Sequence, residues 1–157
     1  MKLLDGKELS LELQKEIAAE VAAHIADGGR KPHLAAVLIG NNPASKSYVG
    51  HKVKACAKAG FVSSLVERSE DITQEELLTI VKDLNEDESV DGFIIQLPLP
   101  SHIDDQAVIK AVKPSKDVDG FHPENVGRMA LNLPTFLPAT PGGIMTLLER
   151  NGVKTSG

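Results

Sequence analysis

The sequence predicts an α/β protein, a three-layer α/β/α domain built around a mainly parallel sheet. Short apolar runs alternate along the chain with longer segments in which apolar residues recur at helical spacing. Strands that alternate with helices in this way are usually parallel, and a nearly continuous apolar run is typical of a strand buried on both faces. The length of 157 residues suits one domain, or one domain and the beginning of another.

The first helix is expected from Gly6 to Ala26, and Gly28 should end it. Its apolar positions recur every fourth residue, at Leu9, Leu13, Ile17, Val21 and Ile25. A buried strand is expected next, at His33–Ile39. Asn42 can cap a second helix, because Pro43 then stands where the first helical turn tolerates proline.

The alternation continues to the end of the chain. Further strands are expected at Phe61–Val66 and Val90–Leu97, and the run Gly92–Ile95 is apolar enough to be the central strand. The helices are expected from Pro43 to Ala59 (closed by Gly60), Thr73–Asn85, Asp104–Val112, Pro123–Ala130, and from Thr140-Pro141 to Arg150, with a loop over Pro114–Gly120. Gly157 follows a helix directly, where the alternation would next place a strand, so the chain looks cut short.

Composition excludes several classes of protein. Apolar residues make up 41% and charged residues 25%, the balance of a soluble globular domain, while 3% aromatic residues leave a core of Leu, Ile, Val and Ala. The formal net charge of −5 argues against a nucleic-acid binder. We expect neither a signal peptide nor a membrane span, and the single Cys56 gives no disulfide framework or cysteine zinc site. A cytoplasmic enzyme fits this composition, as do many non-enzymes.

Parallel sheets bind ligands beyond the carboxyl ends of their strands, which here means the turn after Ile39 and the end of Val90–Leu97. In the helix after the first of these strands, Tyr48 and Lys52 share a face, because helical residues advance about 100° each. Ser45, Val49, Cys56 and Ala59 lie near that face, whereas Ser47, His51, Lys54 and Lys58 point away from it.

Two interpretations of Lys52 remain open on spacing alone. Its ammonium can snorkel from the edge of an apolar stripe. Alternatively, a partly desolvated ammonium gives up its proton more easily and can exchange it with substrate or water. Tyr48 is either a tyrosine at the edge of the core or a flat ring and hydroxyl for an aromatic ligand.

Polar residues later in the chain are equally ambiguous. Gln96 ends an apolar run, so its amide can bond a ligand or a catalytic lysine, or the backbone of the Leu97–Pro100 bend. The loop Lys116–Gly120 brings two carboxylates together, although a plain turn explains it and a metal site is not expected. Thr140 is expected to cap the last helix, with Pro141 in its first turn.

Several motifs in order resemble the methylenetetrahydrofolate dehydrogenase/methenyltetrahydrofolate cyclohydrolase family. They are Gly40-Asn41-Asn42-Pro43-Ala44-Ser45 with Tyr48 and Lys52, Gln96-Leu97-Pro98-Leu99-Pro100, Lys116-Asp117-Val118-Asp119-Gly120-Phe121-His122, and Pro138-Ala139-Thr140-Pro141-Gly142-Gly143. The resemblance covers nearly the whole chain. Ala139 replaces the usual cysteine, which we expect to matter little, because the position should belong to a connecting segment outside the folate site.

The resemblance implies roles for individual residues. Lys52 would be the general acid/base at the one-carbon bridge. Tyr48 would stack on the folate and orient it, and Gln96 would hydrogen-bond Lys52. Asp119 would accept the N–H donors of the pterin, and Leu97 and Pro98 would complete the substrate-binding set.

The resemblance also implies the context of the reaction. The family interconverts 5,10-methylene-, 5,10-methenyl- and 10-formyltetrahydrofolate in one-carbon metabolism, including the supply of purine biosynthesis, in the cytoplasm. Residues 1–137 would be the folate-binding catalytic domain, and residues 138–157 the connecting helix and the start of a Rossmann domain for NADP that this chain lacks. We therefore expect no cofactor-binding residue and no metal here, a homodimer for the full-length enzyme, and hydride transfer only there. The alternative is a catalytically silent folate-binding or subunit-interaction fragment.

Overall fold

The computed structural model describes residues 3–155, and its sheet has three parallel strands in the order β2-β1-β3. Met1, Lys2, Ser156 and Gly157 lie outside the described residues, including the chain end that the sequence analysis considered cut short. β1 (His33–Ile39) pairs along its whole length with β2 (Val62–Arg68) and over four positions with β3 (Gly92–Ile95). Within residues 3–155 the chain forms six helices, of which α1 (Gly6–Ala26) precedes the sheet. The α/β prediction is confirmed.

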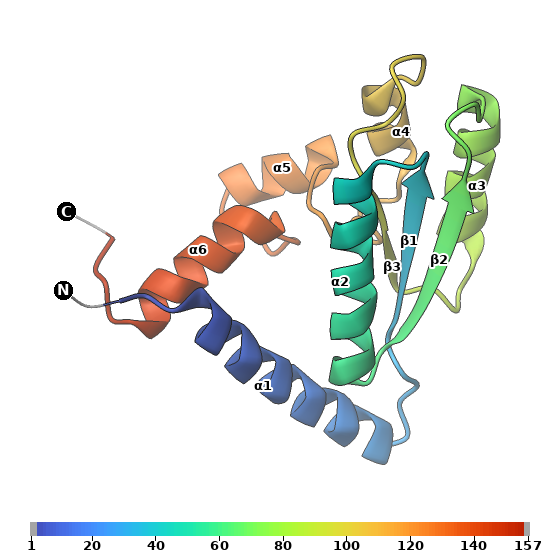
Figure 1. The fold of residues 1–157 in the computed structure, drawn as a ribbon. Helices are drawn as coiled ribbons and strands as arrows, with labels where there is room; N and C mark the ends of the chain where they lie inside the picture. The colour runs from blue at the N-terminus through green and yellow to red at the C-terminus, as the bar shows by residue number, and fades with distance from the viewer. Residues whose placement is uncertain (1–2, 156–157) are drawn as a thin grey trace.

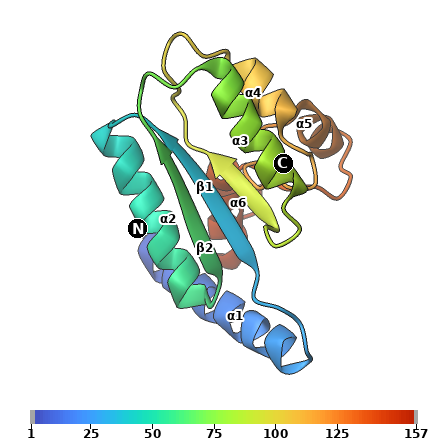
Figure 2. The same cartoon turned by 90° about the vertical axis from the view of Figure 1, so that its right-hand side faces the viewer.

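Helices cover both faces of the sheet (Figures 1 and 2). Alternate residues of β1 point to opposite sides: Val37 and Ile39 pack with α3 (Gln74–Glu86) and α4 (Asp105–Ala111), whereas Leu38 packs with α2 (Pro43–Ala59). α1 lies against α2 on the side away from α3 and α4. The two buried clusters are aliphatic apart from Phe93, as the composition predicts.

The helix bounds follow from local signals. The Asn42 side chain accepts hydrogen bonds from the backbone N–H groups of Ala44 and Ser45, which fixes the start of α2. Gly60 ends α2 in the left-handed conformation, with φ of 82°. Thr73 forms a capping box with Glu76, so α3 begins one residue later than predicted.

Two sequence predictions about the strands are wrong in detail. β1, rather than Gly92–Ile95, is the central strand, and β3 is short, with one isolated bridge from Phe93 to Asp117 on its other side. β2 extends to Arg68 instead of ending at Val66, because its pairing follows β1 as far as Ile39. Glu67 and Arg68 are tolerated there because β2 is an edge strand within the described sheet.

The last two helices lie beside the three layers of sheet and helices and do not cover the sheet (Figure 1). α5 (Pro123–Ala130) has the predicted bounds, and α6 (Ala139–Arg150) begins one residue before the predicted cap. Pro138 is its N-cap and no side chain caps it, so the prediction that Thr140 is the cap is wrong. Arg150 of α6 forms a paired hydrogen bond with Glu16 of α1 at 2.7 and 3.0 Å. None of the helices within residues 3–155 combines the length and the apolar character needed to cross a bilayer.

Candidate functional site

An open cleft of about 390 Å³ lies beyond the carboxyl end of β3. Four parts of the chain line it: α2, the end of β3 and the segment after it, the loop before α5, and the start of α6. The lining residues are Tyr48, Lys52, Ile95, Gln96, Leu97, Asp119, Phe121, Pro138, Ala139, Thr140 and Pro141. The cleft therefore brings together five of the six site residues predicted from the sequence. Pro98, the sixth, is exposed and does not line the cleft; it follows Leu97 through a cis peptide bond.

α2 places Lys52 as its helical spacing predicted. Val49, Cys56 and Ala59 on the neighbouring positions are buried, whereas Lys54 and Lys58 are exposed. The Lys52 side chain is 39% exposed, so it is neither fully solvated nor enclosed. Tyr48, one turn earlier, is 63% exposed and presents its ring to the cleft. The tyrosine is thus a cleft residue and not part of the core.

Lys52 forms an ion pair with Asp119, which arrives from the loop between α4 and α5. Lys52 Nζ and Asp119 Oδ1 are 3.7 Å apart, and the Asp119 side chain is only 20% exposed. Burial raises the pKa of the Asp119 carboxyl, the nearby Asp117 carboxylate raises it further, and Lys52 opposes both effects. Within the described residues no backbone N–H or hydroxyl donates to Asp119, so the site contains a poorly solvated carboxylate with acceptor capacity to spare.

The second carboxylate of that loop has a different role. Asp117 is 6% exposed, and its Oδ2 accepts from the backbone N–H of His122 at 2.8 Å and from Asn125 Nδ2 at 2.9 Å. Asp117 therefore organises the turn, as the plain interpretation of this loop predicted, while Asp119 faces the cleft. Residues 3–155 contain no group of three or more His, Cys, Asp or Glu side chains placed to hold a metal ion.

Gln96 lines the cleft but bonds the backbone. Its amide nitrogen donates to the carbonyl oxygen of Leu97 at 2.7 Å, while its own backbone N–H donates to Val37. This corresponds to the second of the two interpretations that the sequence left open. The ionic partner of Lys52 in this structure is Asp119, and Gln96 makes no hydrogen bond to the lysine within the described residues.

Sequence reasoning missed the wall of the cleft opposite α2. Phe121 is 45% exposed and follows the Asp117–Gly120 loop, which was the available signal: an aromatic residue directly after a glycine turn. Ala139 lies at the start of α6 and lines the same cleft, although the sequence analysis expected this position to belong to a connecting segment outside the site.

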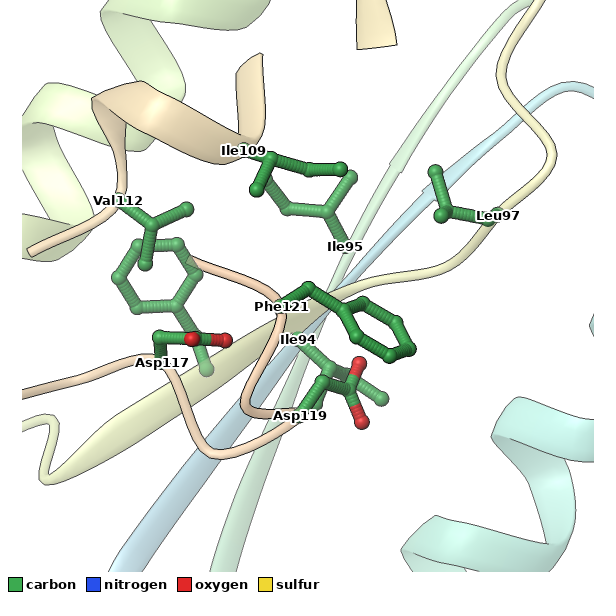
Figure 3. Close-up of a pocket in the computed structure, with 9 residues that line it drawn as sticks. Ile94, Ile95, Leu97, Ile109, Val112, Asp117, Asp119 and Phe121 are labelled. Carbon is green, nitrogen blue, oxygen red and sulfur yellow. The ribbon is translucent and has the colours of Figure 1, made fainter. Parts of the chain in front are cut away.

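A small inner cavity of about 20 Å³ lies behind the cleft (Figure 3). It shares Ile95, Leu97, Asp119 and Phe121 with the cleft, and Ile109 and Val112 close it on the α4 side. A volume of this size has room for about one water molecule. The loop side of the cleft is therefore nearly solid, and its shape depends on where Asp119 and Phe121 are held.

The chain resembles proteins of one family. The family model described as "Tetrahydrofolate dehydrogenase/cyclohydrolase, catalytic domain" matches residues 4–119. The bifunctional protein FolD of Flavobacterium johnsoniae is 60% identical over 157 residues, which are 100% of this chain and 53% of that protein. FolD of Cytophaga hutchinsonii is 57% identical, over 100% of this chain and 54% of the relative. The chain thus spans about half the length of the curated relatives it matches and corresponds to their N-terminal half.

Solved structures agree with the sequence match. The bifunctional FolD methylenetetrahydrofolate dehydrogenase/cyclohydrolase of Campylobacter jejuni superposes with a TM-score of 0.96 at 44% identity, over 100% of this chain and 56% of that one. A Trypanosoma brucei N5,N10-methylenetetrahydrofolate dehydrogenase-cyclohydrolase, complexed with NADP cofactor and inhibitor, gives 0.92 at 38% identity, over 98% and 52% of the two chains.

Proposed function

The chain belongs to the tetrahydrofolate dehydrogenase/cyclohydrolase family, and on that premise we propose that its cleft binds a reduced folate and hydrolyses 5,10-methenyltetrahydrofolate to 10-formyltetrahydrofolate. In the complete protein the same site would also serve the oxidation of 5,10-methylenetetrahydrofolate. The observation that supports this most directly is the convergence of Lys52 and Asp119, from distant parts of the sequence, beside the exposed ring of Tyr48.

Each residue has a chemical role in this proposal. The Tyr48 ring offers a flat face for the aromatic part of the folate. Asp119 accepts the N–H donors of the pterin, and a buried anionic acceptor makes such bonds strong. Leu97 contributes the apolar edge of the cleft opposite α2, while Pro98 next to it supports the bend. The folate would thus lie between α2 and the loop before α5.

The ion pair links binding to catalysis. When donors of the pterin occupy the Asp119 carboxylate, Lys52 Nζ lies beside the one-carbon bridge, where it can act as the general base. The amine then accepts a proton from the water that attacks the methenyl carbon. The C–N5 bond breaks and N5 takes the proton from Lys52. The hydroxyl of the adduct releases its proton to solvent and becomes the C=O of the formyl group on N10. Gln96 lines the same cleft, and we propose that its amide leaves the Leu97 carbonyl to orient Lys52 or the attacking water.

The hydride acceptor is assigned to the complete protein. We propose NADP, because the Trypanosoma brucei relative is described with that cofactor. Residues 3–155 contain no glycine-rich strand-to-helix turn of the kind that cradles a dinucleotide pyrophosphate, so they do not fit the cofactor. A homodimer, a cytoplasmic location and a role in purine biosynthesis complete the proposal for the full-length protein.

Hydrolysis of 5,10-methenyltetrahydrofolate by this chain tests the proposal. The loss of its absorbance is followed for the wild type, for Lys52→Met, and for Lys54→Met as a matched control on the exposed face of the same helix. We expect turnover in the wild type and in Lys54→Met and only the spontaneous rate in Lys52→Met. Folded but inactive protein in all three cases would reduce this chain to a folate-binding or subunit-interaction fragment.

A further inference from the structure

A buried asparagine is hydrogen-bonded to both segments that form the wall of the cleft opposite α2, the loop that carries Asp119 and the segment before α6. Asn125 of α5 is 4% exposed, and its amide nitrogen donates to the Pro114 carbonyl oxygen and to Asp117 Oδ2, both at 2.9 Å. Its amide oxygen accepts from the Thr135 hydroxyl at 2.9 Å. A reversed amide would place oxygen against a carbonyl and a carboxylate, so the orientation of Asn125 is fixed by its partners.

Asp117, Asn125 and Thr135 lie close in sequence or by hydrogen bond to the residues that line both parts of this wall. Asp117 lies two positions before Asp119, and its carboxylate also accepts from the backbone N–H of His122, which follows Phe121. Thr135 lies in the segment that leads to Pro138 and the start of α6, the other part of this wall. Asn125 is thus hydrogen-bonded on one side to the loop that carries Asp119 and on the other to the segment that carries the α6 wall.

The loop that carries Asp119 packs closely against the segment before α6, so neither can move far without displacing the other. Gly120 lies between Asp119 and Phe121 with φ of 69°, and a Cβ added to it would lie 2.7 Å from the Phe136 carbonyl oxygen and 3.1 Å from the Pro138 nitrogen. A small movement of either segment therefore changes where the Asp119 carboxylate stands relative to Lys52 and the cleft.

We infer that Thr135, Asn125 and Asp117 form a positioning relay that holds Asp119 where a folate can use it. The inference rests on the proposed function, which gives Asp119 its ligand. None of the three touches the cleft itself, so they are positioning residues, and Asp119 remains the binding group. Lys52 lies on α2, outside the relay, and keeps its place when the loop moves, so loosening the relay should act mainly on folate binding and only secondarily, through the ion pair with Asp119, on the chemical step.

A pair of substitutions at Thr135 tests the relay with little risk to folding. Thr135→Val keeps the shape and removes the hydroxyl, whereas Thr135→Ser keeps the hydroxyl. In hydrolysis of 5,10-methenyltetrahydrofolate we expect KM to rise about fivefold in Thr135→Val, with kcat within twofold, and wild-type values in Thr135→Ser. A purely structural role would lower kcat through loss of folded protein and leave KM unchanged, which would overturn the inference.

A second buried asparagine supplies a control for general loosening of the loop. Asn85 hydrogen-bonds the chain just before this loop, at the Ala111 carbonyl oxygen and the Lys113 N–H. Within residues 3–155 it makes no hydrogen bond to Asp117 or Thr135. Asn125→Ala should raise KM about tenfold, whereas Asn85→Ala should lower the urea midpoint without raising KM. An equal rise of KM in both variants would show that any loosening suffices and would refute the relay.

The position of Asp119 can also be followed without a ligand, which separates failure of the relay from failure of the proposed function. The titration of its carboxyl carbon is measured by NMR in the wild type and in both Thr135 variants. Because burial raises the pKa of Asp119, a looser loop should lower that pKa in Thr135→Val and leave it unchanged in Thr135→Ser. If the wild type shows no turnover, the proposed function fails for this chain, and identical Asp119 titrations in all three proteins would then overturn the relay independently.

Discussion

Replacing Gly120 by alanine should destabilise the protein through two separable costs. The residue has φ of 69°, a left-handed conformation that costs a non-glycine residue about 1–2 kcal/mol. The new Cβ would also lie 2.7 Å from the Phe136 carbonyl oxygen, a backbone atom. Forcing a methyl group into such a space costs about 1–3 kcal/mol. Gly120→Ala should therefore lose about 2–5 kcal/mol of the total stability of about 5–15 kcal/mol typical of a domain.

Gly40 provides a control that separates the two costs. It follows β1 with φ of 75°, and a Cβ there would meet Glu70 at an ordinary contact distance of 3.5 Å. Gly40→Ala should therefore lose only the conformational term, about 1–2 kcal/mol. In urea unfolding followed by circular dichroism, the midpoint of Gly120→Ala should lie about 1 M below that of Gly40→Ala, because m-values of small domains are about 1–3 kcal/mol/M.

Equal midpoints for the two variants would refute the steric part of this reasoning. They would show that the Phe136 segment withdraws freely when Gly120 gains a side chain. The close approach of the loop and the α6 wall would then not constrain the cleft, and the structural basis of the Thr135–Asn125–Asp117 relay would be weakened as well.

Three further predictions concern residues in or next to the cleft. Because burial raises the folded-state pKa of Asp119, its own contribution to stability should fall as pH rises from about 3.8 through the raised value. The difference in urea stability between Asp119→Asn and wild type should therefore grow in favour of the variant over that range, and the variant should bind folate more weakly. Burial raises the pKa of the Cys56 thiol, so a thiol reagent at pH 8 should modify native protein far more slowly than protein unfolded in urea; equal rates would contradict its burial. Because no side chain caps α6, Thr140→Ala should lower the free energy of unfolding, measured in urea, by less than the roughly 1 kcal/mol lost with an N-cap. A larger loss would show that Thr140 caps the helix after all.

The parts of the fold that could be predicted are those that depend on neighbours in the sequence. The bounds of α1, β1, α2 and α5 agree with the prediction because capping side chains, glycines and apolar spacing act within a few residues. The face of α2 that carries Lys52 was predictable for the same reason. The strand order was not, because Gly92–Ile95 is as apolar as β1 and pairing between strands is decided by tertiary packing.

The same limit applies to the cleft. Spacing could place Tyr48 and Lys52 on one face of a helix, and the position of Gln96 at the end of an apolar run marked it as a candidate. The family resemblance added Leu97 and the role of Asp119. Neither showed that Lys52 is paired with Asp119, because that distance depends on the loop conformation set by Asp117. The wall formed by Phe121 and the start of α6 has no periodic signal in the sequence, so it became visible only in three dimensions.

Under the proposed function, the burial of Asp119 lowers the stability of the folded protein but leaves its carboxylate free to accept hydrogen bonds from a ligand. Within residues 3–155 every buried side-chain nitrogen and oxygen has a hydrogen-bond partner, and Asp117, two residues before Asp119, accepts two hydrogen bonds at its Oδ2. Asp119 is desolvated by burial, and within the described residues its carboxylate is balanced by Lys52 alone, at 3.7 Å, with no backbone N–H or hydroxyl donor. A carboxylate held in this way gains more from incoming N–H donors than a solvated one does, because part of its water has already been removed. In the proposed relay, the hydrogen bonds of Asp117 hold the loop that carries Asp119, so a structural carboxylate positions the proposed binding carboxylate.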